Sequence, residues 1–141
     1  MPRSLSRLLI PLTVTALLGG ACSDDGGSPG DGATIDVTLV DDGVTLSETE
    51  ASSGTLTFDT TNEGTLTHEI EVFEGEKDPA SLPIEDHVAD TEGWTLIDEI
   101  EDITPGASAP LTLDLEPGTY QVVCNLSGHF EKGMYATLTV S

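Results

Sequence analysis

Apolar and polar residues alternate in short segments along most of the chain after residue 34. In residues 35–40 the apolar Ile35, Val37 and Leu39 alternate with polar residues, and in residues 111–115 every second residue is leucine. A period of two is typical of a strand with one buried face. Shorter or less regular segments of the same kind lie at residues 44–46, 54–60, 68–73, 94–103, 120–123 and 135–140. The pattern predicts an all-β fold.

Turn residues separate these segments every eight to twelve positions, which is typical of a β-sandwich. We therefore expect a Greek-key sandwich of seven or eight strands with antiparallel pairing. The alternation fails at residues 74–93, where Asp78-Pro79 predicts a turn or two of helix with Asp as N-cap. About 110 residues form the folded part, which is enough for one core and no second domain.

The amino-terminal residues have the composition of an export signal. Arg3 and Arg7 precede a mainly apolar run at residues 8–18, which is too short for a membrane span. Residues 1–21 are therefore predicted to be a signal peptide. Cys22 at its end resembles the acylated cysteine of bacterial lipoproteins, although Gly19 stands where such signals usually carry an aliphatic residue. Plain secretion without a lipid is the alternative.

Residues 22–33 are mostly glycine, aspartate and serine and have no apolar period. This composition predicts a flexible tether that begins with a lipidated Cys22. The tether leads to a domain at residues 34–141. We expect an exported protein, lipid-anchored at the outer face of a bacterial cell membrane, or periplasmic or extracellular if the lipid is absent.

Acidic residues dominate the charge of the exported part. The chain has 26 Asp and Glu residues, all after Cys22, where only Lys77 and Lys132 oppose them, so this part carries −24. Such a charge disfavours nucleic acid and anionic membrane surfaces as partners. It fits either steering toward a basic redox partner or a general adaptation to salt and solubility. Its spread over most strands favours the second interpretation.

Three metal-binding side chains lie in one predicted loop between two strands. Cys124, His129 and Met134 are spaced five residues apart. A thiol, an imidazole and a thioether together suit copper, and a blue-copper site adds one more histidine to make a trigonal His₂Cys set with a weak axial Met. His68 begins a predicted strand, whereas His87 has no soft ligand near it in sequence and is expected to be a solvated loop histidine.

The order of these residues resembles that of a known family. Asn62-x-Gly-x3-His68, followed by Pro117-Gly-x-Tyr120-x3-Cys124-x4-His129-x4-Met134, is similar to the plastocyanin/azurin family of small blue copper proteins, the cupredoxins. The ligand loop is more like that of rusticyanin-type members, and the resemblance covers residues 35–140.

The resemblance implies a cupredoxin-like sandwich with one copper ion held by four ligands, His68, Cys124, His129 and Met134. Asn62 or Asn125 would hydrogen-bond between the His68 strand and the ligand loop. Cupredoxins often carry Asn or Ser directly after the first histidine, where this chain has Glu69, so the role of Glu69 is open. If Cys22 is acylated, Cys124 is the one remaining thiol. A buried core cysteine is the alternative, but its place five residues before a histidine favours a ligand.

We expect a one-electron carrier outside the cytoplasmic membrane, with His129 as the electron exit beside Leu126 and Phe130. The alternatives are a copper storage, sensing or delivery module without redox turnover, and a metal-free surface domain. An enzyme is disfavoured, because multicopper oxidases and nitrite reductases need further histidine-rich sites and only His87 is spare. The expected partner is a redox protein such as a cytochrome or a copper oxidase. We expect the protein to be a monomer that contacts the membrane only through its lipid.

Overall fold

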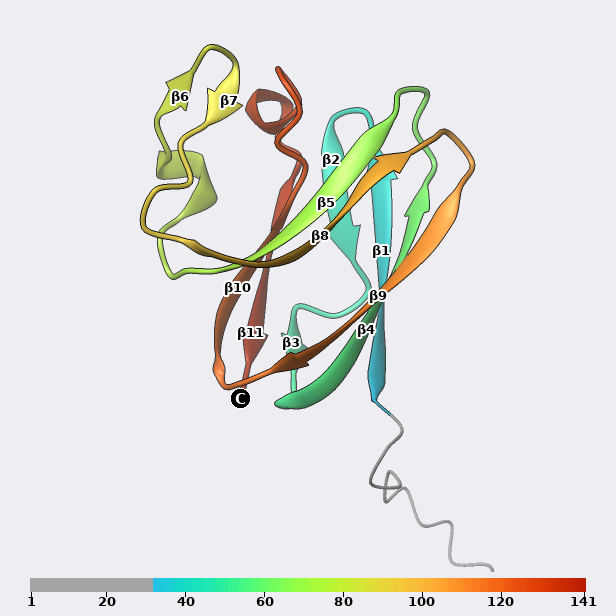
Figure 1. The fold of residues 1–141 in the computed structure, drawn as a ribbon, viewed down its shortest axis with the longest axis vertical. Helices are drawn as coiled ribbons and strands as arrows, with labels where there is room; N and C mark the ends of the chain where they lie inside the picture. The colour runs from blue at the N-terminus through green and yellow to red at the C-terminus, as the bar shows by residue number, and fades with distance from the viewer. Residues whose placement is uncertain (1–31) are drawn as a thin grey trace, which may run out of the picture.

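The structure is a computed structural model that describes residues 32–141 as two packed β-sheets (Figure 1). The first sheet has the order β2-β1-β4-β9, with β1 Ala33–Val40, β2 Gly43–Leu46, β4 Gly54–Asn62 and β9 Ser108–Leu115. The second has the order β3-β11-β10-β5-β8, with β3 Glu50–Ala51, β5 His68–Glu74, β8 Thr95–Ile103, β10 Gly118–Val123 and β11 Tyr135–Val140. The prediction of an all-β sandwich is confirmed. The predicted signal peptide, Cys22 and most of the tether lie outside the described residues.

Strand pairing differs from the antiparallel expectation at two places. β1 runs parallel to β4, with Ile35 opposite Phe58, and β3 runs parallel to β11. Parallel neighbours need a connection that leaves the sheet. Here the chain leaves β2, pairs briefly as β3 with the second sheet, and returns to the first sheet as β4 on the other side of β1. The alternation could not show this, because it reveals which face of a strand is buried and not which neighbour pairs with it.

The alternating apolar residues form the interior of the sandwich. Ile35, Val37 and Leu39 of β1 are buried, and so is Phe58 of β4. Ile70 and Val72 face them from β5, and Tyr120, Val122, Leu138 and Val140 face them from β10 and β11. Each such side chain contributes about 1.5–3 kcal/mol when fully removed from water. The core therefore fixes which side of these strands points inward, and with it the inward direction of the His68 side chain.

The irregular segment forms a small subdomain against the outside of the second sheet. It contains a 3-10 turn, η1 Pro79–Ser81, and a hairpin of β6 Ile84–Glu85 and β7 Val88–Ala89. The Asp78 side chain accepts the N–H of Ala80, as the predicted N-cap should. Asp86 and His87 both have positive φ, the conformation that a two-residue type I′ hairpin requires. The sequence did not reveal this hairpin, because its strands are too short to show a period.

Trp94 and β8 depart from the predicted alternation. Trp94 precedes β8 and packs on Phe73 in a second apolar cluster under the hairpin, with ring centroids 5.6 Å apart. Most of β8 is exposed, and its register with β5 shifts twice. This strand forms one edge of the second sheet, and only its Ile103 is deeply buried.

Three connections gather at one end of the sandwich (Figure 1). They are the β1–β2 turn, the β4–β5 connection and the β10–β11 loop, which contains a second 3-10 turn, η2 Phe130–Lys132. Within residues 32–141, no helix is long and apolar enough to cross a membrane. All the predicted ligands lie at or near this end.

Candidate metal centre

His68 is the first residue of β5 and shares its inward phase with Ile70 and Val72. Its side chain is therefore drawn into the end of the core, where it has no exposed surface. A buried imidazole must have its ring nitrogens satisfied, because an unpaired buried polar group costs about 1–3 kcal/mol. A carboxylate faces Nε2 of the His68 ring, and the other nitrogen, Nδ1, faces His129 and Cys124.

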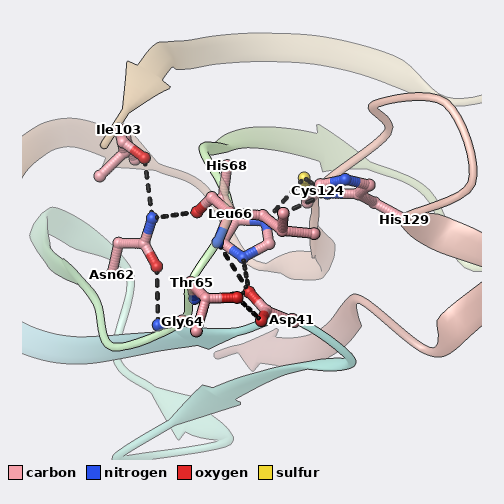
Figure 2. Close-up of polar contacts among 9 residues, drawn as sticks. All are labelled: Asp41, Asn62, Gly64, Thr65, Leu66, His68, Ile103, Cys124 and His129. Carbon is pink, nitrogen blue, oxygen red and sulfur yellow. Dashed lines mark hydrogen bonds and ion pairs between the residues drawn. The ribbon is translucent and has the colours of Figure 1, made fainter. Parts of the chain in front are cut away.

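Asn62 shapes the turn that leads to His68. Its buried side chain donates to the carbonyls of Leu66 and Ile103, each at 2.8 Å, and accepts the N–H of Gly64 at 2.9 Å (Figure 2). All three of these bonds lie within the turn or reach β8. The Asn62 amide thus holds the turn before His68 in shape and does not join the His68 strand to the ligand loop.

Asp41 in the β1–β2 turn is the partner of the His68 ring (Figure 2). Its Oδ1 lies 3.1 Å from His68 Nε2 and accepts the N–H groups of Thr65 at 2.8 Å and Leu66 at 3.1 Å. Its Oδ2 accepts the Thr65 hydroxyl at 2.6 Å. The Thr65 hydroxyl, together with the backbone N–H groups, holds the pKa of Asp41 well below its usual range. An ionised carboxylate can only accept, so His68 donates from Nε2 and keeps a lone pair on Nδ1.

The ligand loop begins where β10 ends. The N–H of Cys124 donates to the Met134 carbonyl at 3.0 Å, which closes the loop at its base. Inside the loop, the N–H of His129 donates to the carbonyl of Leu126 at 2.8 Å. Gly133 ends η2 with a φ of 100°, in the left-handed region that favours glycine. The Cys124 and Met134 side chains are both fully buried. The backbone of the loop therefore places a thiol and a thioether at the end of the core.

Three donor atoms converge within this pocket of side chains. His68 Nδ1 lies 3.1 Å from His129 Nδ1, and Cys124 Sγ lies 3.5 Å from His129 Nδ1 and 3.9 Å from His68 Nδ1. Bonds of about 2.0–2.3 Å, the lengths that zinc makes to imidazole and thiolate, separate three donors around one ion by roughly 3.5–3.9 Å. The observed triangle agrees within a few tenths of an ångström. These residues fit a single transition-metal ion without rearrangement.

Local electrostatics favours neutral forms of these donors before a metal arrives. Burial raises the pKa of the Cys124 thiol, while the backbone N–H groups of Glu69 and Leu126 oppose that shift. Burial also lowers the pKa of His129, and the nearby His68 and Lys132 lower it further. A neutral imidazole binds metal directly, whereas the thiol must release a proton on binding. The two backbone N–H groups then remain to stabilise the thiolate.

The small hairpin holds the ligand loop from outside. The Asn125 side chain accepts the N–H of Ala89 at 2.8 Å and donates to its carbonyl at 3.2 Å. The N–H of Gly128 donates to the His87 carbonyl at 2.7 Å. Asn125 therefore joins the loop to β7 and not to the His68 strand. Burial raises the pKa of the Glu69 carboxyl, and the backbone N–H of Asn125 opposes that shift.

His87 and Phe130 lie apart from the converging donors. The His87 side chain is 72% exposed and meets Glu131 at 3.3 Å, as a solvated loop histidine would. Phe130, the residue after His129, is buried against Tyr135, with ring centroids 4.9 Å apart. Leu126 is half-buried beside the main core.

Asp41 is the functional residue that sequence reasoning missed. Asp41-Asp-Gly43 has the composition of a turn, but Asp41 also continues the two-residue phase of Ile35, Val37 and Leu39. An acidic residue at the next inward position of a strand is a signal that was available. What it contacts depends on the β4–β5 connection, which the sequence does not place.

Comparison with known proteins identifies the family. The family model of the sulfocyanin (SoxE) domain matches residues 51–141, which is more than half of the chain. The chain belongs to the sulfocyanin family. Sulfocyanins are blue copper proteins, which carry electrons and are not enzymes. No curated protein matches the sequence.

Solved structures share the fold. An auracyanin from Roseiflexus castenholzii is 24% identical, with a TM-score of 0.57 over 78% of this chain and 99% of that one. Auracyanin A of Chloroflexus aurantiacus is 19% identical, with a TM-score of 0.53 over 77% and 98%. Rusticyanin from Thiobacillus ferrooxidans is 16% identical, with a TM-score of 0.54 over 78% and 79%. At these identities the likeness supports the cupredoxin fold.

The metal of this sulfocyanin is copper. His68, Cys124 and His129 would hold the ion through converging nitrogen and sulfur atoms, and the buried Met134 thioether would supply the fourth ligand of a type 1 site. The thioether and thiolate exclude the hard cations, which prefer oxygen ligands.

Proposed function

We propose that this sulfocyanin is a one-electron carrier that works outside the cytoplasmic membrane. The observation that carries the proposal is a donor set supplied by the protein alone: two imidazoles and the Cys124 sulfur converge within 4.8 Å of one another, and the Met134 thioether is buried in the same core cluster as Cys124. A site whose ligands come from the protein alone leaves no position for a substrate, which suits electron transfer. When bound, copper supplies the Cu(I)/Cu(II) couple.

The residues of the chain keep the ligands in one arrangement during that exchange. Asp41 and Asn62 fix the His68 side, and backbone bonds together with Asn125 fix the loop side. Burial of Cys124 and Met134 excludes water from the sulfur ligands. His129 is the half-buried ligand, so its ring edge is the path of electrons to a partner.

Substitution of the thiolate tests the assignment. We expect the copper-loaded domain to be intensely blue or green when oxidised, with one copper per chain, and Cys124→Ser to lose the colour because the charge-transfer band needs the thiolate. His87→Ala is the matched control, since that histidine is exposed and lies outside the donor set. Full colour in the Cys124→Ser protein would overturn the proposal.

The second part of the proposal concerns attachment and partner. Acylation of Cys22 would tether the domain to the outer face of the membrane, and residues 23–33 would give it reach. The wild-type protein should then partition with membranes, and Cys22→Ala should release it. A soluble wild-type protein with an unmodified amino terminus would remove the lipid anchor and leave the copper chemistry standing. The partner is a redox protein, such as a cytochrome or a copper oxidase, that approaches His129.

A further inference from the structure

Four hydrogen bonds converge on the carboxylate of Asp41, and one of them joins it to a copper ligand. Oδ1 serves His68 Nε2 and the N–H groups of Thr65 and Leu66, while Oδ2 holds the Thr65 hydroxyl. The Asp41 side chain is 34% exposed and the His68 side chain is fully buried. Thr65 and Leu66 of the β4–β5 connection thus hold the carboxylate in place independently of its bond to the imidazole.

Gly64 makes the close approach of these two groups possible. A Cβ at this position would collide with Asp41 Oδ1 and would lie 2.9 Å from His68 Nε2. Contacts that short are not tolerated by ordinary side chains, so any larger residue must separate the carboxylate from the ring. The glycine, the carboxylate and the histidine therefore form one unit, although they come from two connections far apart in sequence.

A carboxylate on the outer nitrogen of a metal-bound histidine has two physical consequences. It fixes the tautomer and orientation of the ring, and it makes the ligand nitrogen more basic. In addition, a fixed negative charge close to the site favours the more positive oxidation state of a metal. Both effects act on Cu(II) more strongly than on Cu(I).

We propose that Asp41 is a positioning residue that locks His68 in the Nε2–H tautomer and lowers the reduction potential of the site. Its effect on the potential rests on the proposed electron-transfer function, whereas its effect on the tautomer needs no copper. The two claims can therefore fail separately from the copper assignment.

Asp41→Asn tests the charge. The amide oxygen still accepts from His68 Nε2, so the ring keeps its place while the negative charge is lost. We expect the equilibrium between Cu(II) and Cu(I) to shift toward Cu(I) by about tenfold, a rise of ~59 mV for one electron. Asp42→Asn is the matched control: it removes the same charge from an exposed neighbour, and its shift should be less than a third as large. Equal shifts in the two variants would show that only the general surface field acts, which would overturn the proposal.

Asp41→Ala and Gly64→Ala test the positioning. In metal-free protein, nitrogen NMR should show His68 as the Nε2–H tautomer in wild type and Asp41→Asn, and as a mixture in Asp41→Ala. Gly64→Ala keeps the net charge, yet it should raise the potential toward that of Asp41→Asn because the carboxylate is pushed off the ring. Should Asp41→Ala fail to fold, Gly64→Ala alone decides the matter. An unchanged tautomer in Asp41→Ala, or an unchanged potential in a folded Gly64→Ala protein, would contradict the assignment.

Discussion

The two histidine ligands of this sulfocyanin are held in different ways. His68 begins a strand, has no exposed surface, and its outer nitrogen is bonded to Asp41. His129 lies in a loop and is half-buried, and within residues 32–141 its Nε2 has no hydrogen-bond partner. The side chains around His68 fix its ring directly, whereas the ring of His129 is placed by the backbone of its loop. One ligand is thus part of the core and the other is part of the surface.

This difference assigns separate tasks to the two ends of the site. The His68 end acts on the metal through the buried imidazole and the Asp41 carboxylate that is hydrogen-bonded to it. The exposed end offers a short path for electrons, at the cost of a less constrained ligand. The same substitution made on the His68 side and on the His129 side of the site should therefore change the protein to different extents.

The largest difference is expected when each imidazole is removed. His68→Gly and His129→Gly should both lose the colour of the oxidised protein, because the trigonal set is broken. Added imidazole should restore the colour in His129→Gly, where the vacated space reaches solvent, and not in His68→Gly, where it lies inside the core. Absorption spectra with increasing imidazole measure the rescue. Equal rescue of both variants would break the comparison.

The next difference is expected at the two asparagines. The Asn62 side chain is buried and makes three hydrogen bonds. The Asn125 side chain is half-buried and makes two hydrogen bonds, both to the backbone of Ala89. Asn62→Ala should lower the free energy of unfolding by about 2–4 kcal/mol, and Asn125→Ala by about 1–2 kcal/mol. Urea unfolding of the metal-free variants measures both. A cost for Asn125→Ala as large as that for Asn62→Ala would mean that the loop depends on the hairpin as much as His68 depends on its turn.

A smaller effect is expected on the outer face of β5. Glu71 is partly buried and lies opposite Glu99, and burial with the neighbouring carboxylates raises its pKa to about 7. A raised carboxyl pKa means that the folded state holds the proton more tightly. Stability should therefore fall as the pH rises from about 4.5 to 7, by about 1–2 kcal/mol after solvent screening.

Glu71→Gln should remove this dependence, so that the variant is more stable than wild type at pH 8 and similar to it at pH 4. The exposed Glu48→Gln provides the control for loss of a charge. Urea unfolding across this pH range measures the effect. A wild-type protein whose stability rises from pH 4.5 to 7 relative to Glu71→Gln would contradict the assigned direction.

The parts of this structure that the sequence could predict are those that depend on local pattern. The residue pattern predicted the strand that His68 begins, and the spacing from Cys124 to Met134 predicted three donors in one loop. The parts that it could not predict depend on contacts between distant connections. The bond from Asp41 to His68 and the link from Asn125 to Ala89 join segments that no period relates. The parallel pairing of β1 with β4 was missed for the same reason.

The central claim is that four ligands held by the fold exchange one electron without losing the metal. Spectroelectrochemical titration of the copper-loaded domain, with copper counted before and after repeated cycles, tests it most directly. The account predicts a charge-transfer band that disappears and returns fully, with a one-electron slope of about 59 mV per tenfold change, and one copper per chain throughout. Release of copper on reduction, or a band that does not return, would contradict the account and favour a module that stores or delivers the metal.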